Sequence, residues 1–257
     1  MYILVIICFT LINITTSLQT RIITMHPLEK WPESMQFPAI PASQVVKESL
    51  PLYTQYMLDH GRRFHMEVGN LEMIACFLSH IHIWNMVTHV NDTFLILEED
   101  AVLSTEEMDK IDDILHSMHN ETWDIIMLAG RMWHVSHGEP RGFNQYLMQC
   151  EQPRACSWFG TRGYLLHPQG ARKLLDNIPD MVIQVDAYIS LMNSYYEPGF
   201  KLFWVKNEIV HGKWLRISTV WDACFICYIS PFVSWVILCC IVIILVYLLK
   251  KRSTPKA

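Results

Sequence analysis

Hydrophobic residues recur at helical spacing in two stretches of the chain. From Leu71 to Val90 the apolar positions follow three- and four-residue steps, which predicts a helix with one buried face: Ile74, Phe77, Leu78, Ile81, Trp84 and Val87. A second helix is predicted to start at Ser104, with Glu107 in the capping-box position. Its inner stripe consists of Met108, Ile111, Ile114, Leu115 and Met118.

Short apolar runs between these helices predict strands. They are Arg21 to Met25, a brief run at Phe37 to Ile40, Phe94 to Leu97, Trp123 to Leu128, Tyr164 to Leu166 and, as the last strand, Phe203 to Val205. His167 and Pro168 open a helix through Leu175, and Val182 to Ile189 leads into another. The alternation of strands and helices predicts an α/β fold. Ala129 to Ala155 is predicted to be a long binding or disordered loop.

An acidic cluster ends the most apolar of these strands. The run from Thr93 to Leu97 is followed directly by Glu98, Glu99 and Asp100. In open α/β sheets, ligands bind at the carboxyl ends of the strands. Two carboxylates one residue apart suit a hard divalent cation that holds a diphosphate.

Both ends of the chain differ from the middle. Ala223 to Leu249 contains no charge, and about 20 apolar residues cross a bilayer, so a transmembrane helix is predicted there. Lys250, Lys251 and Arg252 follow, which by the positive-inside rule predicts a cytosolic tail and a lumenal or exterior main domain.

The N-terminus also resembles a targeting segment. Tyr2 to Ile14 is a charge-free run of signal-peptide length, and Thr15 and Ser17 suit a cleavage site. Because no basic residues precede it, an uncleaved anchor or a first strand from Tyr2 to Cys8 stays open. The predicted divisions are residues 1–18, a leader; 19–221, the lumenal domain; 222–249, the membrane helix; and 250–257, the tail.

Composition adds three expectations. Of eight cysteines, three fall in the soluble part; Cys150 and Cys156 are the preferred disulfide pair, and Cys76 is expected to be a buried residue of a helix. Glycosylation sequons at Asn13, Asn91 and Asn120 fit a secretory route. The net charge of −5, without a basic block outside the tail, argues against nucleic acid as a partner.

Two blocks of sequence resemble one known family. Residues 76–80 (CFLSH), Trp84 and residues 94–101 (FLILEEDA) resemble the glycosyltransferase family 25 pattern of a "GC-x-L-S-H…W" helix followed by an "L-E-D-D-A" strand end. Residues 163–175 (GYLLHPQGARKLL) and 184–186 (QVD) are similar to the family's second block. The resemblance covers roughly residues 68–210.

This resemblance implies a fold, a donor and a cofactor. The fold would be GT-A-like, an α/β domain with a mixed, mostly parallel sheet. The enzyme would transfer a hexose, most often galactose, from a UDP-sugar to a protein or glycan acceptor with inversion. It would use Mn²⁺ or another divalent metal, because a metal held by carboxylates stabilises the departing diphosphate. The enzyme would act in the lumen of the endoplasmic reticulum or Golgi.

The resemblance also assigns roles to residues. Glu98 and Asp100 would bind the metal, and Glu99 stands at the middle position of the motif. His211 is the candidate for a further metal ligand. Asp186 would be the general base for the acceptor hydroxyl; the alternative is a helix N-cap.

Three more residues have open or weaker roles. His80 either reaches the nucleotide site or hydrogen-bonds within the core, and its neighbour His82 points to another face of the helix. Trp133 and His134, in the predicted long loop, are candidates for sugar stacking.

The N-terminal strand departs from the family pattern. Where the family has an arginine-containing turn that contacts the nucleotide, this chain has residues 24–31 (TMHPLEKW), without arginine. The glycines of the family's "G-E-I-G-C" segment are also replaced in residues 72–76 (EMIAC). Two interpretations therefore stay open: an active membrane-anchored transferase, or an inactive relative that acts as a binding or adhesion protein.

Overall fold

The computed structural model describes residues 18–60, 66–90, 92–135, 141–149, 156–178 and 180–212, together with Val236 and Cys240. For residues 131–135, 156–159, 193 and 194 only the backbone is described. The chain divides into two compact units. Unit 1 comprises residues 1–39, 79–178 and 186–213, and unit 2 comprises residues 40–78, 179–185 and 214–257.

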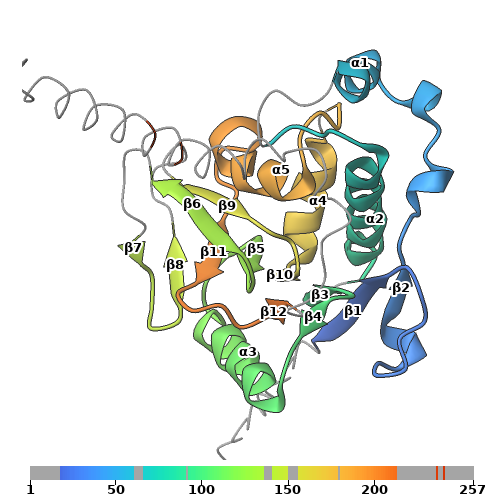
Figure 1. The fold of residues 1–257 in the computed structure, drawn as a ribbon. Coiled ribbons are helices and arrows are strands. Elements are labelled where there is room, and N and C mark those ends of the chain that lie inside the picture. The colour runs from blue at the N-terminus through green and yellow to red at the C-terminus, as the bar shows by residue number, and fades with distance from the viewer. Residues whose placement is uncertain are drawn as a thin grey trace, which may run out of the picture. The chain divides into compact units, whose positions relative to one another are not determined.

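An eight-stranded sheet forms the centre of the described part of unit 1 (Figure 1). Its spatial order is β2-β1-β3-β10-β5-β11-β8-β7. The strands are β1 (Gln19–Thr24), β2 (Gln36–Pro38), β3 (Phe94–Glu98), β5 (Ile125–Met127), β7 (Arg141–Gly142), β8 (Leu147–Gln149), β10 (Gly163–Leu166) and β11 (Leu202–Val205).

The sheet is mixed, as predicted. β1 pairs in parallel with β2 and β3, and β11 pairs in parallel with β5. β10 runs antiparallel to both of its neighbours, β3 and β5, and β8 is antiparallel to β11. The insertion of β10 brings the residues that precede β10 to the carboxyl end of β3.

Successive residues of each strand point to opposite faces of the sheet, and helices cover both faces. Leu95, Leu97, Ile126 and Leu165 lie on the face covered by α3 (Thr105–Ser117), whose Ile111, Ile114 and Met118 are buried in the same cluster. On the opposite face, α4 (Pro168–Asp176) and α5 (Val185–Leu191) cover the sheet (Figure 1). Unit 1 is therefore a three-layer α/β/α structure.

The predicted starts of three helices are confirmed. Ser104 caps α3, its side chain accepting from Glu107 N while the Glu107 carboxylate accepts from Ser104 N, which is the capping box. His167 caps α4, with Pro168 in the first turn. The first predicted helix is α2 (Leu71–Thr88). It is buried on more than one face, because Met73, Ala75 and Ile83 are buried as well, whereas Ile81 is only half-buried.

Two predictions about the later part of the chain are wrong. Residues 129–155 are not one long loop, because they contain β6 (Arg131–Val135), β7 and β8. Phe203–Val205 is not the last strand, since β12 (His211–Gly212) follows and pairs with β4 (Ala101–Val102). These strands are only two to five residues long, too short for an alternating pattern to mark them.

Unit 2 has a small core of its own. Its described part includes α1 (Leu52–His60), the first part of α2 and residues 180–185. Leu50, Met57, Val68, Met73 and Ile74 form its buried cluster. Backbone hydrogen bonds tie residues 66–68 to residues 182–184, so residues 182–184 are extended and α5 begins only at Val185.

Several predictions fall outside the described residues. They concern the leader, the membrane helix apart from Val236 and Cys240, the sequons at Asn13 and Asn91, and the Cys150 to Cys156 disulfide. No helix in the described part of the chain is both long and apolar enough to cross a membrane. Asn120 lies in an exposed turn after α3, and Cys76 is half-buried rather than buried.

Candidate functional site

The acidic cluster lies at the carboxyl end of β3, beside the amino end of β10. Because the two strands are antiparallel, Leu97 pairs with Gly163, and Glu98 N donates to Arg162 O over 2.9 Å. Residues 160–162 are therefore neighbours of residues 98–100. A Cβ at residue 163 would lie 2.7 Å from Val210, so only glycine allows Val210 to cover this point of the sheet.

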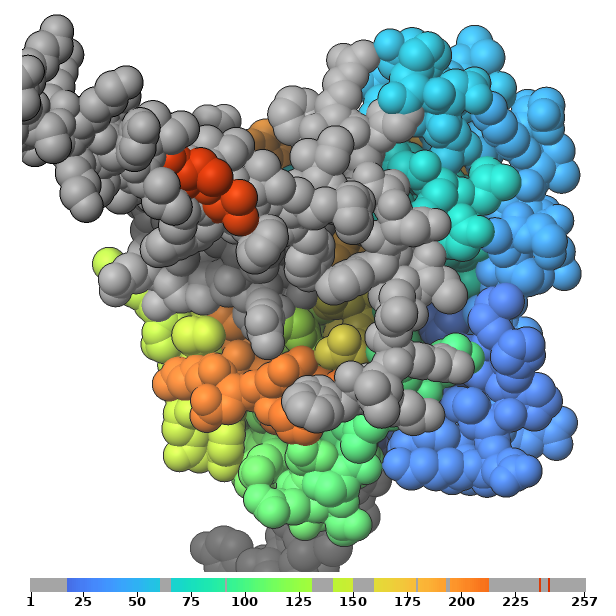
Figure 2. Space-filling model, viewed as in Figure 1, coloured from blue at the N-terminus to red at the C-terminus, as the bar shows by residue number. Residues whose placement is uncertain are grey.

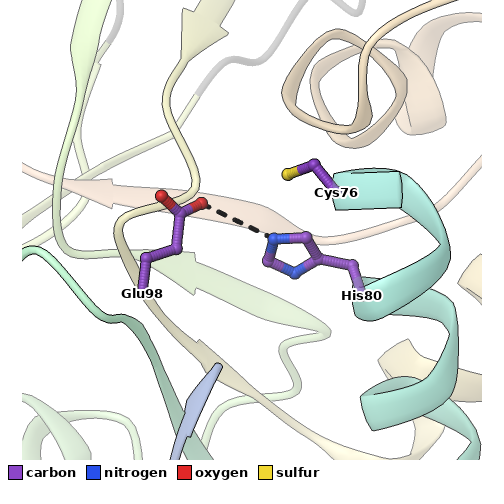
Figure 3. Close-up of side chains that lie close together, drawn as sticks. All are labelled: Cys76, His80 and Glu98. Carbon is purple, nitrogen blue, oxygen red and sulfur yellow. Dashed lines mark ion pairs between the residues drawn. The ribbon is translucent and has the colours of Figure 1, made fainter. Parts of the chain in front are cut away.

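Glu98 is held by two side chains. Thr161 Oγ1 donates to Glu98 Oε1 over 2.6 Å, and His80 Nε2 lies 3.6 Å from the same oxygen (Figure 3). Burial alone would raise the pKa of Glu98, but His80, Thr161 and Arg162 together lower it below its usual value. Glu98 is consequently a carboxylate at neutral pH.

His80 lies inside unit 1, with 1% of its surface exposed. Its Nδ1 is 2.7 Å from Tyr164 Oη, which also accepts a hydrogen bond from Trp84 Nε1 over 3.0 Å. Its Nε2 is buried and has no hydrogen-bond partner among the described residues. Cys76 lies one turn earlier in α2, and the imidazole points toward Glu98 (Figure 3). His80 is thus both a core residue and a neighbour of the acidic cluster.

Asp100 is paired with an arginine. Arg162 Nε donates to Asp100 Oδ2 over 3.4 Å, and Arg162 Nη1 donates to Glu208 Oε1, also over 3.4 Å. The other oxygen of Asp100, Oδ1, is buried without a hydrogen-bond partner in the described part of the chain. Burial and the charge of Glu98 raise the pKa of Asp100 above its usual value, although Arg162 opposes the shift.

Glu99 contacts a different strand. Its Oε2 accepts hydrogen bonds from Thr24 Oγ1 over 3.2 Å and from Met25 N over 3.1 Å. These contacts join the ends of β1 and β3. Glu98 and Asp100 instead contact Thr161 and Arg162, the residues that precede β10. The two outer carboxylates of the motif therefore lie beside β10, whereas the middle carboxylate lies beside β1.

Asp186 lies in the first turn of α5. Its Oδ1 accepts from Ala187 N over 2.7 Å, and its Oδ2 accepts from Gly160 N over 3.0 Å. Gly160 has a φ of 115°, a conformation that favours glycine. Burial raises the pKa of Asp186, the two backbone hydrogen bonds lower it, and the charge of Glu98 raises it further, with a net rise. Asp186 therefore interacts electrostatically with the acidic cluster.

His211 lies near the acidic motif, because β12 pairs with β4 so that Gly212 is opposite Ala101, and a Cβ at Gly212 would lie 2.8 Å from the Arg162 guanidinium. It lies in β12, is exposed, and its Nε2 is 3.0 Å from Glu107 Oε1 of α3. On the surface, the orange segment that leads to β12 lies against the green of α3 (Figure 2). No contact of His211 with Glu98 or Asp100 is seen. Trp133 and His134 belong to β6, where only the backbone is described.

Sequence reasoning missed Arg162 and its neighbours Thr161 and Tyr164. The available signal was a charged residue immediately before the apolar run of β10, at a strand end. Its meaning depends on strand direction: in a parallel strand, Arg162 would lie at the opposite edge of the sheet from Asp100.

Part of this site fits a divalent cation, because the ligand atoms of His80 and Glu98 lie within 4.8 Å of one another. Asp100 Oδ1 and His80 Nε2 are buried polar atoms that lack hydrogen bonds within the described part of the chain. The charge of Glu98 raises the pKa of Asp100, a repulsion that a bound cation relieves. Carboxylate oxygens are the ligands that Mg²⁺ and Mn²⁺ prefer, and imidazole favours transition metals.

The chain belongs to glycosyltransferase family 25. The sequence profile described as "Glycosyltransferase family 25 (LPS biosynthesis protein)" matches residues 11–189. This range includes Glu98, Asp100 and Asp186 and ends before His211. The resemblance inferred from the two sequence blocks is thereby confirmed.

Curated relatives agree with this assignment. A "Glycosyltransferase 25 family member" of Aedes aegypti is 27% identical over 161 residues, which cover 61% of this chain and 26% of the relative. A Drosophila melanogaster protein of the same name is 28% identical over 163 residues, 62% of this chain and 26% of the relative. "Procollagen galactosyltransferase 1-B" of Xenopus laevis is 28% identical over 124 residues, 46% of this chain and 20% of the relative. The chain spans between 20% and 26% of the length of these relatives.

Proposed function

We propose that this chain is a glycosyltransferase that transfers a hexose from a UDP-sugar to a hydroxyl group of a protein or glycan, with inversion. One observation carries the proposal: Asp100 and Glu98, at the carboxyl end of β3, lie beside Arg162, and Asp100 Oδ1 is buried without a hydrogen bond in the described part of the chain. Galactose is the first candidate sugar, because the Xenopus relative is named a galactosyltransferase.

Glu98 and Asp100 would hold a divalent cation such as Mn²⁺. When bound, the cation acts as a Lewis acid that neutralises the charge of the departing diphosphate. The chain itself prepares the two carboxylates. Thr161 fixes Glu98 by a 2.6 Å hydrogen bond, and Arg162 fixes Asp100. Both carboxylates are therefore already oriented before the donor binds.

Arg162 supplies positive charge to the same place. The guanidinium contacts Asp100 and Glu208, and about a third of the side chain is exposed (33%). Arginine recognises phosphate through paired hydrogen bonds and keeps its charge at every physiological pH. We assign to Arg162 a contact with the donor diphosphate, in place of the arginine turn that residues 24–31 lack.

Asp186 is the proposed general base. The acceptor hydroxyl must lose a proton as it attacks the sugar, and a carboxylate with a raised pKa is a stronger base once it is ionised. Hydrogen bonds from Gly160 N and Ala187 N hold its two oxygens in place. A carboxylate has further acceptor sites, so these bonds leave capacity for the hydroxyl.

The remaining parts of the proposal concern architecture and location. The mixed sheet, with its acidic motif at a strand end, is compatible with a GT-A-like fold. The charge-free residues 223–249, followed by three basic residues, support a C-terminal membrane anchor with the main domain in the lumen of the secretory pathway.

Nucleotide binding tests the proposal. The full chain in detergent, with Mn²⁺, is titrated with UDP, UMP and uridine by calorimetry. We expect UDP to bind more tightly than UMP or uridine. Arg162→Gln should weaken UDP binding about tenfold or more, the value of a charge-assisted hydrogen bond, and leave uridine binding unchanged.

Arg172→Gln is the matched control. It removes the same charge from the exposed surface of α4 and should leave all three affinities unchanged. If neither UDP nor any UDP-sugar binds to the wild-type chain with Mn²⁺, the transferase proposal is wrong. The chain is then better described as an inactive relative that serves as a binding or adhesion protein.

A further inference from the structure

Among the described residues, His80 Nε2 is a buried atom without a hydrogen-bond partner, and a protonated imidazole would form an ion pair with Glu98. Buried polar atoms are nearly always hydrogen-bonded, because an unsatisfied one costs about 1–3 kcal/mol. His80 Nε2 is buried in a side chain that is 1% exposed, and within the described part of the chain it makes none. It points toward Glu98 Oε1 across 3.6 Å (Figure 3).

That distance fits two ligands of one ion better than a hydrogen bond. Hydrogen bonds between nitrogen and oxygen are about 2.7–3.2 Å long. Nitrogen and oxygen ligands of a protein-bound transition metal lie about 2.0–2.2 Å from the ion, so two ligand atoms of the same ion are separated by about 3 Å or more. A separation of 3.6 Å between His80 Nε2 and Glu98 Oε1 falls in this range.

The second ring nitrogen of His80, Nδ1, has the kind of partner that a metal-binding histidine needs. A metal-binding histidine usually donates its second ring N–H to an acceptor, which fixes the tautomer and the ring. Tyr164 Oη lies 2.7 Å from His80 Nδ1 and is itself held by Trp84 Nε1. Metal binding by Nε2 requires the tautomer in which Nδ1 carries the proton and donates it to Tyr164 Oη.

The histidine favoured by sequence lies on β12, beside the residues that follow Asp100, but its side chain has another partner. His211 is exposed, and its Nε2 contacts Glu107, a residue that also caps α3. His80 instead is buried, and its Nε2 lies 3.6 Å from Glu98 Oε1 of the acidic motif.

We infer that His80, through Nε2, is the nitrogen ligand of the divalent cation at Glu98. The inference rests on the proposed donor site and adds to it a preference among metals. Imidazole is a better ligand for Mn²⁺, Co²⁺ or Zn²⁺ than for Mg²⁺, which prefers oxygen. The site therefore takes a transition metal in preference to Mg²⁺.

Electron spin-echo modulation of bound Mn²⁺ tests the ligand directly, because it detects a coordinated ¹⁴N without any measurement of activity. The full chain in detergent is loaded with Mn²⁺ alone. We expect nitrogen modulation in the wild type and in His211→Gln, and its loss in His80→Gln. The affinity for Mn²⁺ should fall about tenfold or more in His80→Gln, and the affinity for Mg²⁺ should change less.

A second measurement needs no variant, in case His80→Gln does not fold. Deuterium exchange at the C2 position of each histidine, followed by mass spectrometry of the wild-type chain, reports metal binding to individual imidazoles. Mn²⁺ should slow the exchange at His80 and leave His211 unchanged.

Three results would overturn the inference: nitrogen modulation that persists in folded His80→Gln, Mn²⁺ binding without nitrogen modulation in the wild type, or protection of His211 instead of His80. If the wild-type chain binds no Mn²⁺, the inference also falls. Titration with UDP in the absence of metal then decides separately whether the proposed transferase falls with it.

Discussion

Asp186 shows how the surroundings of one side chain set its chemistry. Burial withdraws water from the carboxylate and Glu98 adds a nearby negative charge, and both disfavour the ionised form. The hydrogen bonds from Ala187 N and Gly160 N act in the opposite direction but do not cancel the shift. The pKa of Asp186 therefore lies above the ordinary aspartate value of 3.8.

A pH dependence follows from this shift. Below its raised pKa, Asp186 is protonated and cannot accept the acceptor's proton, so the transfer rate should rise with pH as the group ionises. The acid limb of the kcat profile should have a pKa above 3.8. Asp186→Asn should lower kcat about 10²- to 10⁴-fold, the usual contribution of a general base, with little change in donor KM.

Asp112→Asn is the control for this measurement. Asp112 is exposed on α3, so the variant makes the same chemical change away from the site and should keep the wild-type profile. An Asp186→Asn variant with wild-type kcat would leave Asp186 only a structural role, as the acceptor of the hydrogen bonds from Gly160 N and Ala187 N; it is not the predicted N-cap, because α5 begins one residue earlier, at Val185.

At the level of single residues, the sequence predicted which carboxylates belong to the site, but it did not predict which side chains contact them. A carboxylate cluster directly after an apolar strand was visible, and so was the lone Asp186. The roles of Arg162 and Thr161 were not, because they depend on β10 being antiparallel to β3. The environment of His80 Nε2 was also hidden, since a helical pattern shows that a histidine is inside but not what it faces.

Asp124 joins three elements of unit 1. Its backbone oxygen accepts from His167 N at the start of α4, and its buried carboxylate accepts from Lys173 Nζ and from Lys201 N, each over 2.7 Å. Lys173 belongs to α4, and Lys201 immediately precedes β11. Asp124 therefore fixes α4 beside the amino end of β5, a central strand of the sheet.

The close packing of α4 at this point requires glycine. A Cβ at residue 170 would lie 2.2 Å from Asp124 O, a backbone atom that cannot easily move. Gly170→Ala should raise intrinsic helix propensity by up to about 1 kcal/mol, but overpacking costs about 1–3 kcal/mol and occasionally more. We expect a net loss in the free energy of unfolding, measured by urea denaturation.

Gln169→Ala is the matched control. It lies on the exposed side of the same helical turn, so it should leave the stability almost unchanged. A Gly170→Ala variant as stable as the wild type would show that α4 is free to move away from Asp124.

Among the elements, the long and strongly patterned ones were predictable. α2, α3 and α4 followed their apolar spacing and capping residues, and β1, β3, β5, β10 and β11 followed their apolar runs. The short strands β6, β7, β8 and β12 were not found, because two to five residues carry too little pattern. Their existence depends on pairing with distant strands, which is not encoded locally.

For the chain as a whole, membrane attachment is a separate prediction. The full chain, expressed in a eukaryotic cell, should stay in the membrane pellet after carbonate extraction. Replacing both Leu238 and Ile241 with arginine should release it, since a central arginine costs about 2.5–3.5 kcal/mol of insertion free energy. Retention of the double variant in the pellet would show that another segment, such as residues 1–18, anchors the chain.

Turnover of a donor tests the central claim most directly. The full chain in detergent, with Mn²⁺, is incubated with UDP-galactose and a panel of other UDP-sugars, and the release of UDP is measured beside Asp100→Asn. We predict release from one donor, with UDP-galactose the first candidate, and its loss in Asp100→Asn without loss of folding. Equal release by folded Asp100→Asn would contradict the account, as would the absence of both UDP release and UDP binding in the wild type.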